Sequence, residues 1–156
     1  MGTRGGTGVG LVETVPANAT FDAANSTGGV GPTGWSCADN APAGTECRYD
    51  LGTVEVGDPA GTVDFAVTVN ATVPAGTTEL SNTAAIVDDG TNGVDPGPNT
   101  ASDTTPITAN PDLTVIKSDG GATAVPGGQI TYTLTASNIG TEGSAGSVLT
   151  DVVPAN

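Results

Sequence analysis

The stretch TVDFAVTVNATV, residues 62–73, decides the fold class of this 156-residue chain. Its apolar residues alternate with Thr, Asp and Asn, so that Val63, Phe65, Val67 and Val69 fall on one side of an extended backbone. A period of two is typical of a strand that buries one face. Branching at Cβ, which valine and threonine share, favours the pleated surface of a sheet. The stretch therefore predicts a long β-strand.

The stretch QITYTLTAS, residues 129–137, alternates in the same way, with Ile130, Tyr132 and Leu134 on one face and threonines on the other. No segment holds apolar residues at helical spacing for three turns, and Gly or Pro interrupts most windows. We therefore predict an all-β protein built from short strands and tight turns, as in a β-sandwich. The expected strands are residues 8–15, 20–23, 34–37, 47–51, 62–73, 80–87, 113–117, 129–137 and 148–153.

The two ends of the chain repeat one another. GTRGGTGVGLVETVPAN at residues 2–18 aligns without gaps with GTEGSAGSVLTDVVPAN at residues 140–156, at a constant offset of 138. The identical pairs include Leu11 with Leu149 and Val15 with Val153. A fixed internal period is the mark of a repeat array. We interpret the chain as a slice out of such an array, one period long plus a short overlap.

The composition of the chain argues against several classes of function. The chain has no histidine, only three basic residues and seventeen acidic ones, for a formal net charge of −14. Nucleic-acid binding needs clustered Lys and Arg, so a nucleic-acid partner is not expected. The sequence contains no run of about 18 apolar residues, the length that predicts a membrane-spanning helix. A Ser or Cys nucleophile would lack its usual histidine base, and no spacing singles out a catalytic carboxylate pair. We predict a protein without enzymatic activity.

The two cysteines, Cys37 and Cys47, flank a turn-rich segment. Their spacing and the missing histidines argue against a zinc site. If the flanking segments form a hairpin, the two cysteines lie opposite one another and form a disulfide worth about 2–3 kcal/mol. The alternative is a pair of buried free thiols. A disulfide predicts an extracellular or cell-surface location. Trp35 is expected to pack over this bridge, although its ring is also a candidate for stacking on a sugar.

Motifs along the whole chain carry a family resemblance. PDLTVIKSDGGATAVPGGQITYTLTASNIG, residues 111–140, resembles the opening of the conserved-repeat domain of bacterial surface and secreted proteins, catalogued as domain of unknown function eleven. LTDVVPAN and LVETVPAN are similar to its next element, and GWSC, CRYDLG, FAVTV and LSNTAAI follow in the family's order. The matching residues of the opening are Asp112, Leu113, Lys117, Gly128, Thr131, Tyr132, Asn138 and Gly140. The resemblance implies an immunoglobulin-like β-sandwich, in tandem arrays on large extracellular proteins, with no activity established.

Relative to the family, the order of the elements is rotated. Residues 1–107 then form a β-sandwich that lacks its first strands, and residues 112–156 supply the first strands of the following repeat. A sandwich that lacks strands exposes backbone groups that another strand can pair. The expected strand donor carries its apolar residues at Leu113, Val115, Ile130, Tyr132 and Leu134.

Donation to another copy is expected rather than closure within one chain. The link Ile107 to Asp112 reaches only about 20 Å when extended, whereas a ten-residue strand spans about 33 Å. Head-to-tail donation would build a filament, and reciprocal donation would build a dimer. The predicted partners are therefore other copies of the chain or adjacent repeats.

The acidic stretch VDDGTNGVDPGPNTASD is a candidate calcium site. Asp88, Asp89, Asn92 and Asp95 offer the oxygen ligands that calcium prefers. The stretch does not fit the EF-hand pattern. The alternative is a polar turn in which Asp and Asn side chains accept hydrogen bonds from their own backbone.

Two functional hypotheses of different classes follow. The first is a structural repeat that extends a stalk or fibre and assembles by strand exchange. The second is an adhesive module that binds a glycan or a protein through the region of Trp35 or through the acidic loop.

Overall fold

The computed structural model describes residues 5–29, 31–97 and 99–154. Within these ranges it contains eight β-strands and no helix, and all of its sheets are antiparallel, so the prediction of an all-β fold is confirmed. The chain divides into two compact units. The first unit is Met1–Asn70 with Glu79–Ile107, and the second unit is Ala71–Thr78 with Thr108–Asn156.

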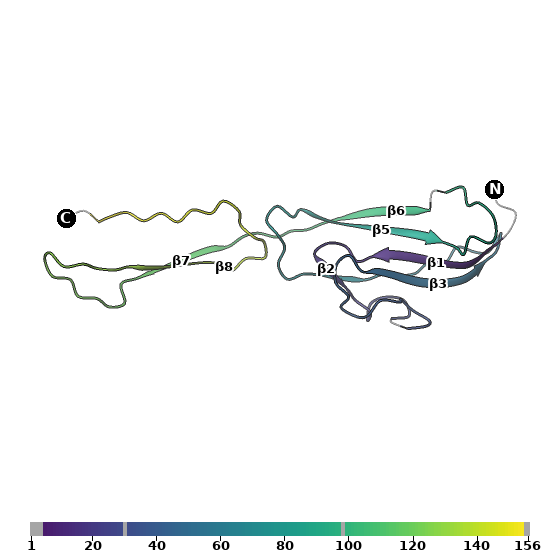
Figure 1. The fold of residues 1–156 in the computed structure, drawn as a ribbon, viewed down its shortest axis with the longest axis horizontal. Coiled ribbons are helices and arrows are strands. Elements are labelled where there is room, and N and C mark those ends of the chain that lie inside the picture. The colour runs from purple at the N-terminus through teal and green to yellow at the C-terminus, as the bar shows by residue number, and fades with distance from the viewer. Residues whose placement is uncertain (1–4, 30, 98, 155–156) are drawn as a thin grey trace. The chain divides into compact units, whose positions relative to one another are not determined.

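The first unit is built on a four-stranded sheet in the order β3-β1-β5-β6, drawn as neighbouring arrows in Figure 1. Its strands are β1 (Gly6–Thr14), β3 (Glu46–Val54), β5 (Glu79–Val87) and β6 (Thr100–Pro106). The register places Leu11 of β1 between Tyr49 of β3 and Ile86 of β5, so these three side chains share one face, called here the inner face.

The strand β6 is not predicted by the sequence pattern. Its sequence, TASDTTP, has no apolar alternation, and every residue in it is exposed. It pairs along its length with β5, from Ala85 opposite Thr100 to Glu79 opposite Pro106. Backbone hydrogen bonds rather than side-chain burial hold such an edge strand, and backbone pairing leaves no signal in hydrophobic periodicity.

A second, smaller sheet pairs β2 (Ala19–Phe21) with β4 (Val67–Val69). The long strand predicted over residues 62–73 is therefore only three residues long, because β2 offers it only three partners. The expected strand at 34–37 is wrong as well. That segment is part of a loop, stabilised by hydrogen bonds such as Trp35 N to Gly29 O at 2.8 Å, and only an isolated bridge joins Trp35 to Tyr49.

The core of the first unit surrounds a disulfide and a cluster of aromatic rings. Cys37 and Cys47 are disulfide-bonded, with their Cα atoms 5.0 Å apart, as predicted. Trp35 is 1% exposed, and its ring centroid lies 4.8 Å from that of Phe65 and 6.5 Å from that of Phe21. Its Nε1 donates to the carbonyl oxygen of Asp64 at 3.1 Å. Trp35 is thus a core residue, and its buried ring offers no face to a sugar.

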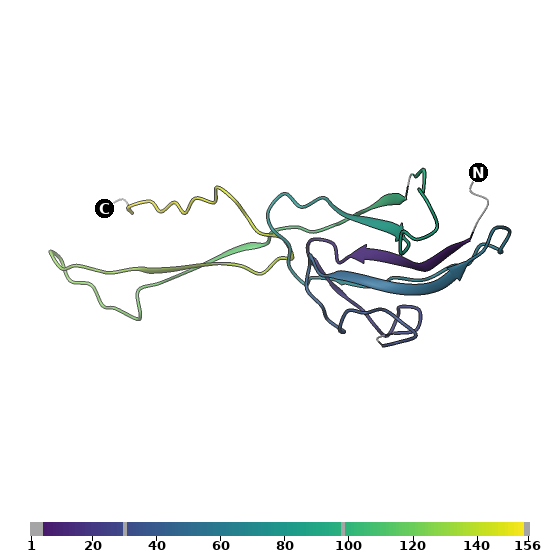
Figure 2. The same ribbon diagram turned by 45° about the vertical axis from the view of Figure 1, so that its right-hand side comes forward.

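The second unit is built on a hairpin of β7 (Leu113–Ser118) and β8 (Thr133–Asn138), visible in Figures 1 and 2. At its base, Asn138 accepts hydrogen bonds from Asp112 N and Gly140 N through Oδ1. The same base includes Val73, which is buried and exchanges backbone hydrogen bonds with Thr141 and Gly143.

Two strand predictions in the second unit need correction. The strand β8 begins at Thr133, so residues 129–132 lie outside it. Residues 148–153, expected as a strand, form no β-ladder among the described residues. This segment lies over the face of the hairpin instead of pairing with one of its edges, and Val148 and Leu149 line a hollow there with Leu113 and Val115.

Candidate interaction surfaces

The inner face of the four-stranded sheet is covered only in part. Near Cys47 it packs against the buried cluster formed by Phe21, Trp35 and their neighbours. The other part borders a hollow of about 560 Å³. The lining includes Leu11, Tyr49, Leu51, Val54, Val63 and Ile86, together with the loop Asp58–Thr62. Ile86 is 40% exposed and Leu51 37%, although both belong to the face that a two-layered sheet normally buries.

The smaller sheet has a free edge. The strand β4 pairs with β2 on one side and has no strand on its other side among residues 5–29, 31–97 and 99–154. A free edge presents unpaired N–H and C=O groups that a further strand can satisfy. The first unit therefore has two incomplete surfaces, the hollow on its inner face and the edge of β4.

Glu13 of β1 and Asn82 of β5 form a polar pair on the same inner face. Asn82 Nδ2 donates to Glu13 Oε2 at 2.9 Å. Partial burial raises the pKa of the Glu13 carboxyl, and the hydrogen bond from Asn82 offsets part of that rise. No basic side chain within the described ranges forms an ion pair with Glu13, since the two ion pairs found there join Arg48 to Asp50 and Lys117 to Asp151.

Asn82 also carries an unsatisfied acceptor. Its Oδ1 is buried and receives no hydrogen bond from the described part of the chain. Buried polar atoms of this kind are normally satisfied, so the exception calls for a donor. On β6, Asp103 stands opposite Asn82 and adds another carboxylate to this face. The Glu13–Asn82 site is therefore rich in acceptors and poor in donors.

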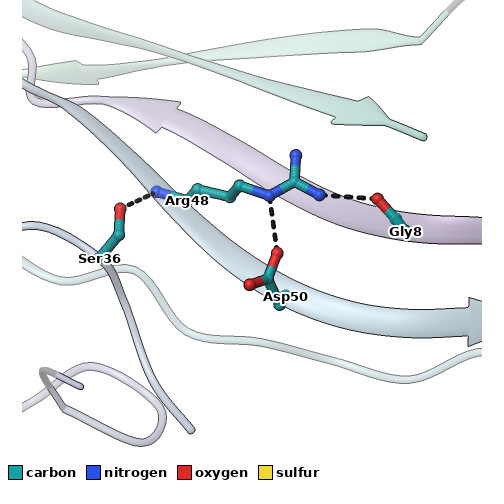
Figure 3. Close-up of polar contacts among 4 residues, drawn as sticks. All are labelled: Gly8, Ser36, Arg48 and Asp50. Atoms are coloured by element: carbon teal, nitrogen blue, oxygen red, sulfur yellow. Dashed lines mark hydrogen bonds and ion pairs between the residues drawn. The ribbon is translucent and has the colours of Figure 1, made fainter. Parts of the chain in front are cut away.

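Arg48 is the basic residue of the first unit that the structure describes, and the register places it on the face of the sheet opposite to Tyr49. Figure 3 shows its polar contacts. Its Nε donates to Asp50 Oδ1 at 2.6 Å and its Nη2 to the carbonyl oxygen of Gly8 at 2.7 Å. Its backbone N–H donates to Ser36 Oγ at 2.9 Å. Gly8 lies where the pairing of β1 with β3 is irregular. Arg48 thus holds the irregular start of β1 in place through Gly8 and pairs with Asp50.

The hairpin of the second unit has one apolar face. The register places Val115 opposite Ala136 and Lys117 opposite Leu134, so these side chains share a face with Leu113. Leu113 is 55% exposed and Val115 57%. Three of the five predicted donor residues, Leu113, Val115 and Leu134, therefore lie on one face of the hairpin. Tyr132 and Ile130 precede β8, and both are exposed.

Lys117 is the charged residue of this apolar face. Its Nζ lies 2.8 Å from both carboxylate oxygens of Asp151 and 4.4 Å from the centroid of the Tyr132 ring. The hydrogen bond from Lys117 lowers the pKa of the Asp151 carboxyl. The sequence does not identify Asp151 as the partner of Lys117, because the contact joins residues 34 positions apart.

The four predicted calcium ligands form hydrogen bonds within their own turns or with Thr7 of β1. Asp88 accepts a hydrogen bond from Gly90 N at 2.9 Å, and Asp95 accepts one from Gly97 N at 3.2 Å. Asp89 accepts from Thr91 and Thr7, which lower its carboxyl pKa, and Asn92 donates to Thr7 at 2.7 Å. No group of three or more His, Cys, Asp or Glu suited to a metal occurs in the described ranges. Calcium binding here stays a prediction.

No helix in the described part of the chain is long and apolar enough to cross a membrane. Comparisons with family models, curated proteins and solved structures found no match. The assignment of a function therefore depends on the two open surfaces, the disulfide and the internal repeat.

Proposed function

We propose that this chain is a non-enzymatic structural repeat of an extracellular stalk or fibre, and that its copies join by exchanging β-strands. The observation that carries the proposal is that each unit leaves an apolar face uncovered. The first unit exposes Leu51 and Ile86 on the inner face of its sheet, and the second unit exposes Leu113 and Val115 on one face of its hairpin. Sheets that bury only part of an apolar face gain stability when a further layer covers it.

The disulfide supports an extracellular setting. Cys37 and Cys47 are both buried and joined to one another, and the described residues include no free cysteine. Disulfides persist where the surroundings are oxidising, as outside the cell. A strongly acidic surface with a net charge of −14 adds solubility to a protein of the cell exterior.

The resemblance to the conserved-repeat domain of bacterial surface proteins supports the same proposal. It would make the first unit an immunoglobulin-like β-sandwich, and the second unit the opening strands of the next repeat. The repeated segments at residues 2–18 and 140–156 are the internal support for a tandem array. In such an array, the role of each repeat is to extend the molecule and to hold its neighbours.

Self-association is tested by size-exclusion chromatography with light scattering over a hundredfold range of protein concentration. We expect dimers or longer assemblies whose mass grows with concentration, and electron microscopy of the concentrated sample separates closed dimers from filaments. A mass that stays monomeric across the whole range would refute strand exchange.

A pair of neighbouring substitutions sharpens this test. Val115→Glu places a charge on the apolar face of the hairpin, whereas Ile116→Glu places the same charge on its opposite face. Both residues are well exposed, at 57% and 67%, so neither substitution disturbs a buried core. We expect Val115→Glu to reduce association and Ile116→Glu to leave it intact. Equal effects would mean that the apolar face is not the surface that associates.

A further inference from the structure

We infer that the open half of the inner face in the first unit is the docking site for the β7–β8 hairpin of a second copy, and that Lys117 of the second copy pairs there with Glu13. The inference rests on the proposed strand exchange and adds to it the receiving surface and the ion pair that sets the register of the exchange.

The internal repeat supplies the first step. The offset of 138 makes Leu11 equivalent to Leu149 and Glu13 equivalent to Asp151. In the second unit, both later residues face the hairpin. Leu149 borders a hollow of about 420 Å³ together with Leu113 and Val115, and Asp151 accepts both hydrogen bonds from Lys117. The chain therefore already contains one occurrence of the repeated segment with a hairpin lying against it.

In the second step, the earlier occurrence of the repeated segment, residues 2–18, is compared with the later one. No hairpin of the described chain lies against Leu11 and Glu13. In the first unit, Leu11 lines the open hollow of about 560 Å³ beside Ile86. Glu13 forms no ion pair with a described residue. A hairpin that met Leu11 and Glu13 as β7 meets Leu149 and Asp151 would fill the hollow with Leu113 and Val115.

The third step is the chemistry of the Glu13–Asn82 site. Glu13 is a half-buried carboxylate with a raised pKa, and the buried Asn82 Oδ1 lacks a donor among the described residues. A lysine ammonium has three N–H donors and a positive charge, so one Lys117 can satisfy both acceptors. Arg48 does not compete for this role, because Asp50 and Gly8 already hold its guanidinium.

The exchange also costs Lys117 only a weak surface ion pair. Its present pair with Asp151 is between half-exposed side chains, and such surface pairs add little stability. Moving Lys117 to Glu13 keeps one ion pair and places it in a more buried site. At the same time the docked hairpin removes the apolar side chains of Leu113 and Val115 from water.

The registers favour the hairpin of a second copy over the chain's own. Glu13 of β1 pairs with Ala84 of β5, and Ala84 pairs with Ala101 of β6, so Glu13 and Ala101 lie at the same height along the sheet. From Ala101, β6 continues for five more residues to Pro106, about 17 Å further along. In the second unit β7 starts beside Leu149, the equivalent of Leu11, so a docked β7 would start at the height of Leu11. Leu11 lies two residues before Glu13, about 7 Å away in the direction opposite to Pro106. The chain would have to return about 24 Å and also cross about 10 Å to the facing layer, a path of about 26 Å. The seven Cα–Cα steps from Pro106 to Leu113 span at most about 25 Å when fully extended.

Disulfide trapping tests the docking site. Ile86→Cys in one preparation and Val115→Cys in a second preparation of different mass are mixed, equilibrated and mildly oxidised. We expect a crosslinked species that contains one chain of each kind, at several times the yield given by the control Ile116→Cys, which lies on the opposite face of the hairpin. Equal yields from Val115→Cys and Ile116→Cys would overturn the docking site.

The doubly substituted chain, with both Ile86→Cys and Val115→Cys, separates the two sources of the hairpin. Crosslinked dimers or longer chains are expected after oxidation at a concentration where the wild type associates. A crosslink that forms within single chains would overturn the assignment to a second copy.

Charge reversal tests the ion pair. We expect Glu13→Lys and Lys117→Glu each to weaken association at least about tenfold, and the double variant, in which the two charges are exchanged, to recover most of the loss. Because Lys117 is exposed, Lys117→Glu remains informative even if Glu13→Lys fails to fold. Failure of the double variant to regain association would exclude the ion pair.

The failures can be told apart. If the wild type associates but shows neither the crosslink nor the charge rescue, the docking site is wrong and strand exchange through another surface stands. If the wild type does not associate at any concentration, both proposals fall.

Discussion

The chain contains the same segment twice, and the two occurrences adopt different structures. Leu11 lies in the middle of a central strand with neighbours on both sides, whereas Leu149 lies in a segment without a described β-ladder. The sequences match at many positions, so local propensity does not explain the difference. Strand edges on β3 and β5 are available to the first occurrence, while the second lies over a hairpin face. Strand formation here is a property of the neighbours more than of the segment.

The largest expected contrast between the units comes from the disulfide. Replacing both Cys37 and Cys47 with serine removes the crosslink from the core of the first unit, at a cost of about 2–5 kcal/mol. The second unit contains no cysteine, so its stability should not change. Fluorescence of the single tryptophan, Trp35, follows unfolding of the first unit, and amide exchange along Leu113–Ser118 follows the hairpin. Equal destabilisation of both regions would show that they fold as one cooperative unit.

A matched pair of truncations tests the repeat directly. Leu11→Ala removes a partly buried side chain that packs against the core, and we expect a loss of about 2 kcal/mol in the free energy of unfolding. Leu149→Ala makes the same change at the equivalent position, where the side chain is 52% exposed, and should cost less than about 0.5 kcal/mol. Urea unfolding of the two variants measures both values. Similar losses would mean that Leu149 is as well packed as Leu11.

These contrasts also show what the sequence could reveal. The period-two alternation around Val67 and the pair Cys37 and Cys47 predicted the fold class and the disulfide, because both signals are local. The edge strand β6 carries no such signal, since its residues are held by backbone pairing and stay exposed. The Glu13–Asn82 contact joins residues 69 positions apart and depends on the strand order, which periodicity does not encode.

The two equivalent carboxylates, Glu13 and Asp151, should respond to pH in opposite directions. Burial raises the pKa of Glu13 in the folded chain, so its contribution to stability is present below the ordinary pKa of glutamate and is lost as the pH rises through the raised value. Lys117 lowers the pKa of Asp151, so its contribution is present above the ordinary pKa of aspartate and is lost as the pH falls through the lowered value.

NMR titration of the carboxyl carbons in the monomer measures both midpoints. We expect the Glu13 midpoint above the usual range for glutamate and the Asp151 midpoint below that for aspartate. Glu13→Gln should stabilise the first unit at neutral pH by less than about 1 kcal/mol, since the group is only half-buried. At a concentration where copies associate, the Glu13 midpoint should fall toward the usual value, because docked Lys117 favours the carboxylate. A Glu13 midpoint that is normal in the monomer would remove the reason for a buried cation there.

The smallest expected effect concerns a position where the two occurrences differ. Gly10 in the first occurrence corresponds to Val148 in the second, and a Cβ added at Gly10 would collide with the guanidinium of Arg48. Gly10→Val gains β-propensity but displaces Arg48 from its hydrogen bonds with Gly8 and Asp50. The two effects nearly cancel, and we expect a net loss of about 0.5–1 kcal/mol. In an Arg48→Ala background the collision is gone, so Gly10→Val should there become neutral or stabilising. A double-mutant cycle by urea unfolding isolates this coupling, and purely additive losses would mean that the space above Gly10 is not reserved for Arg48.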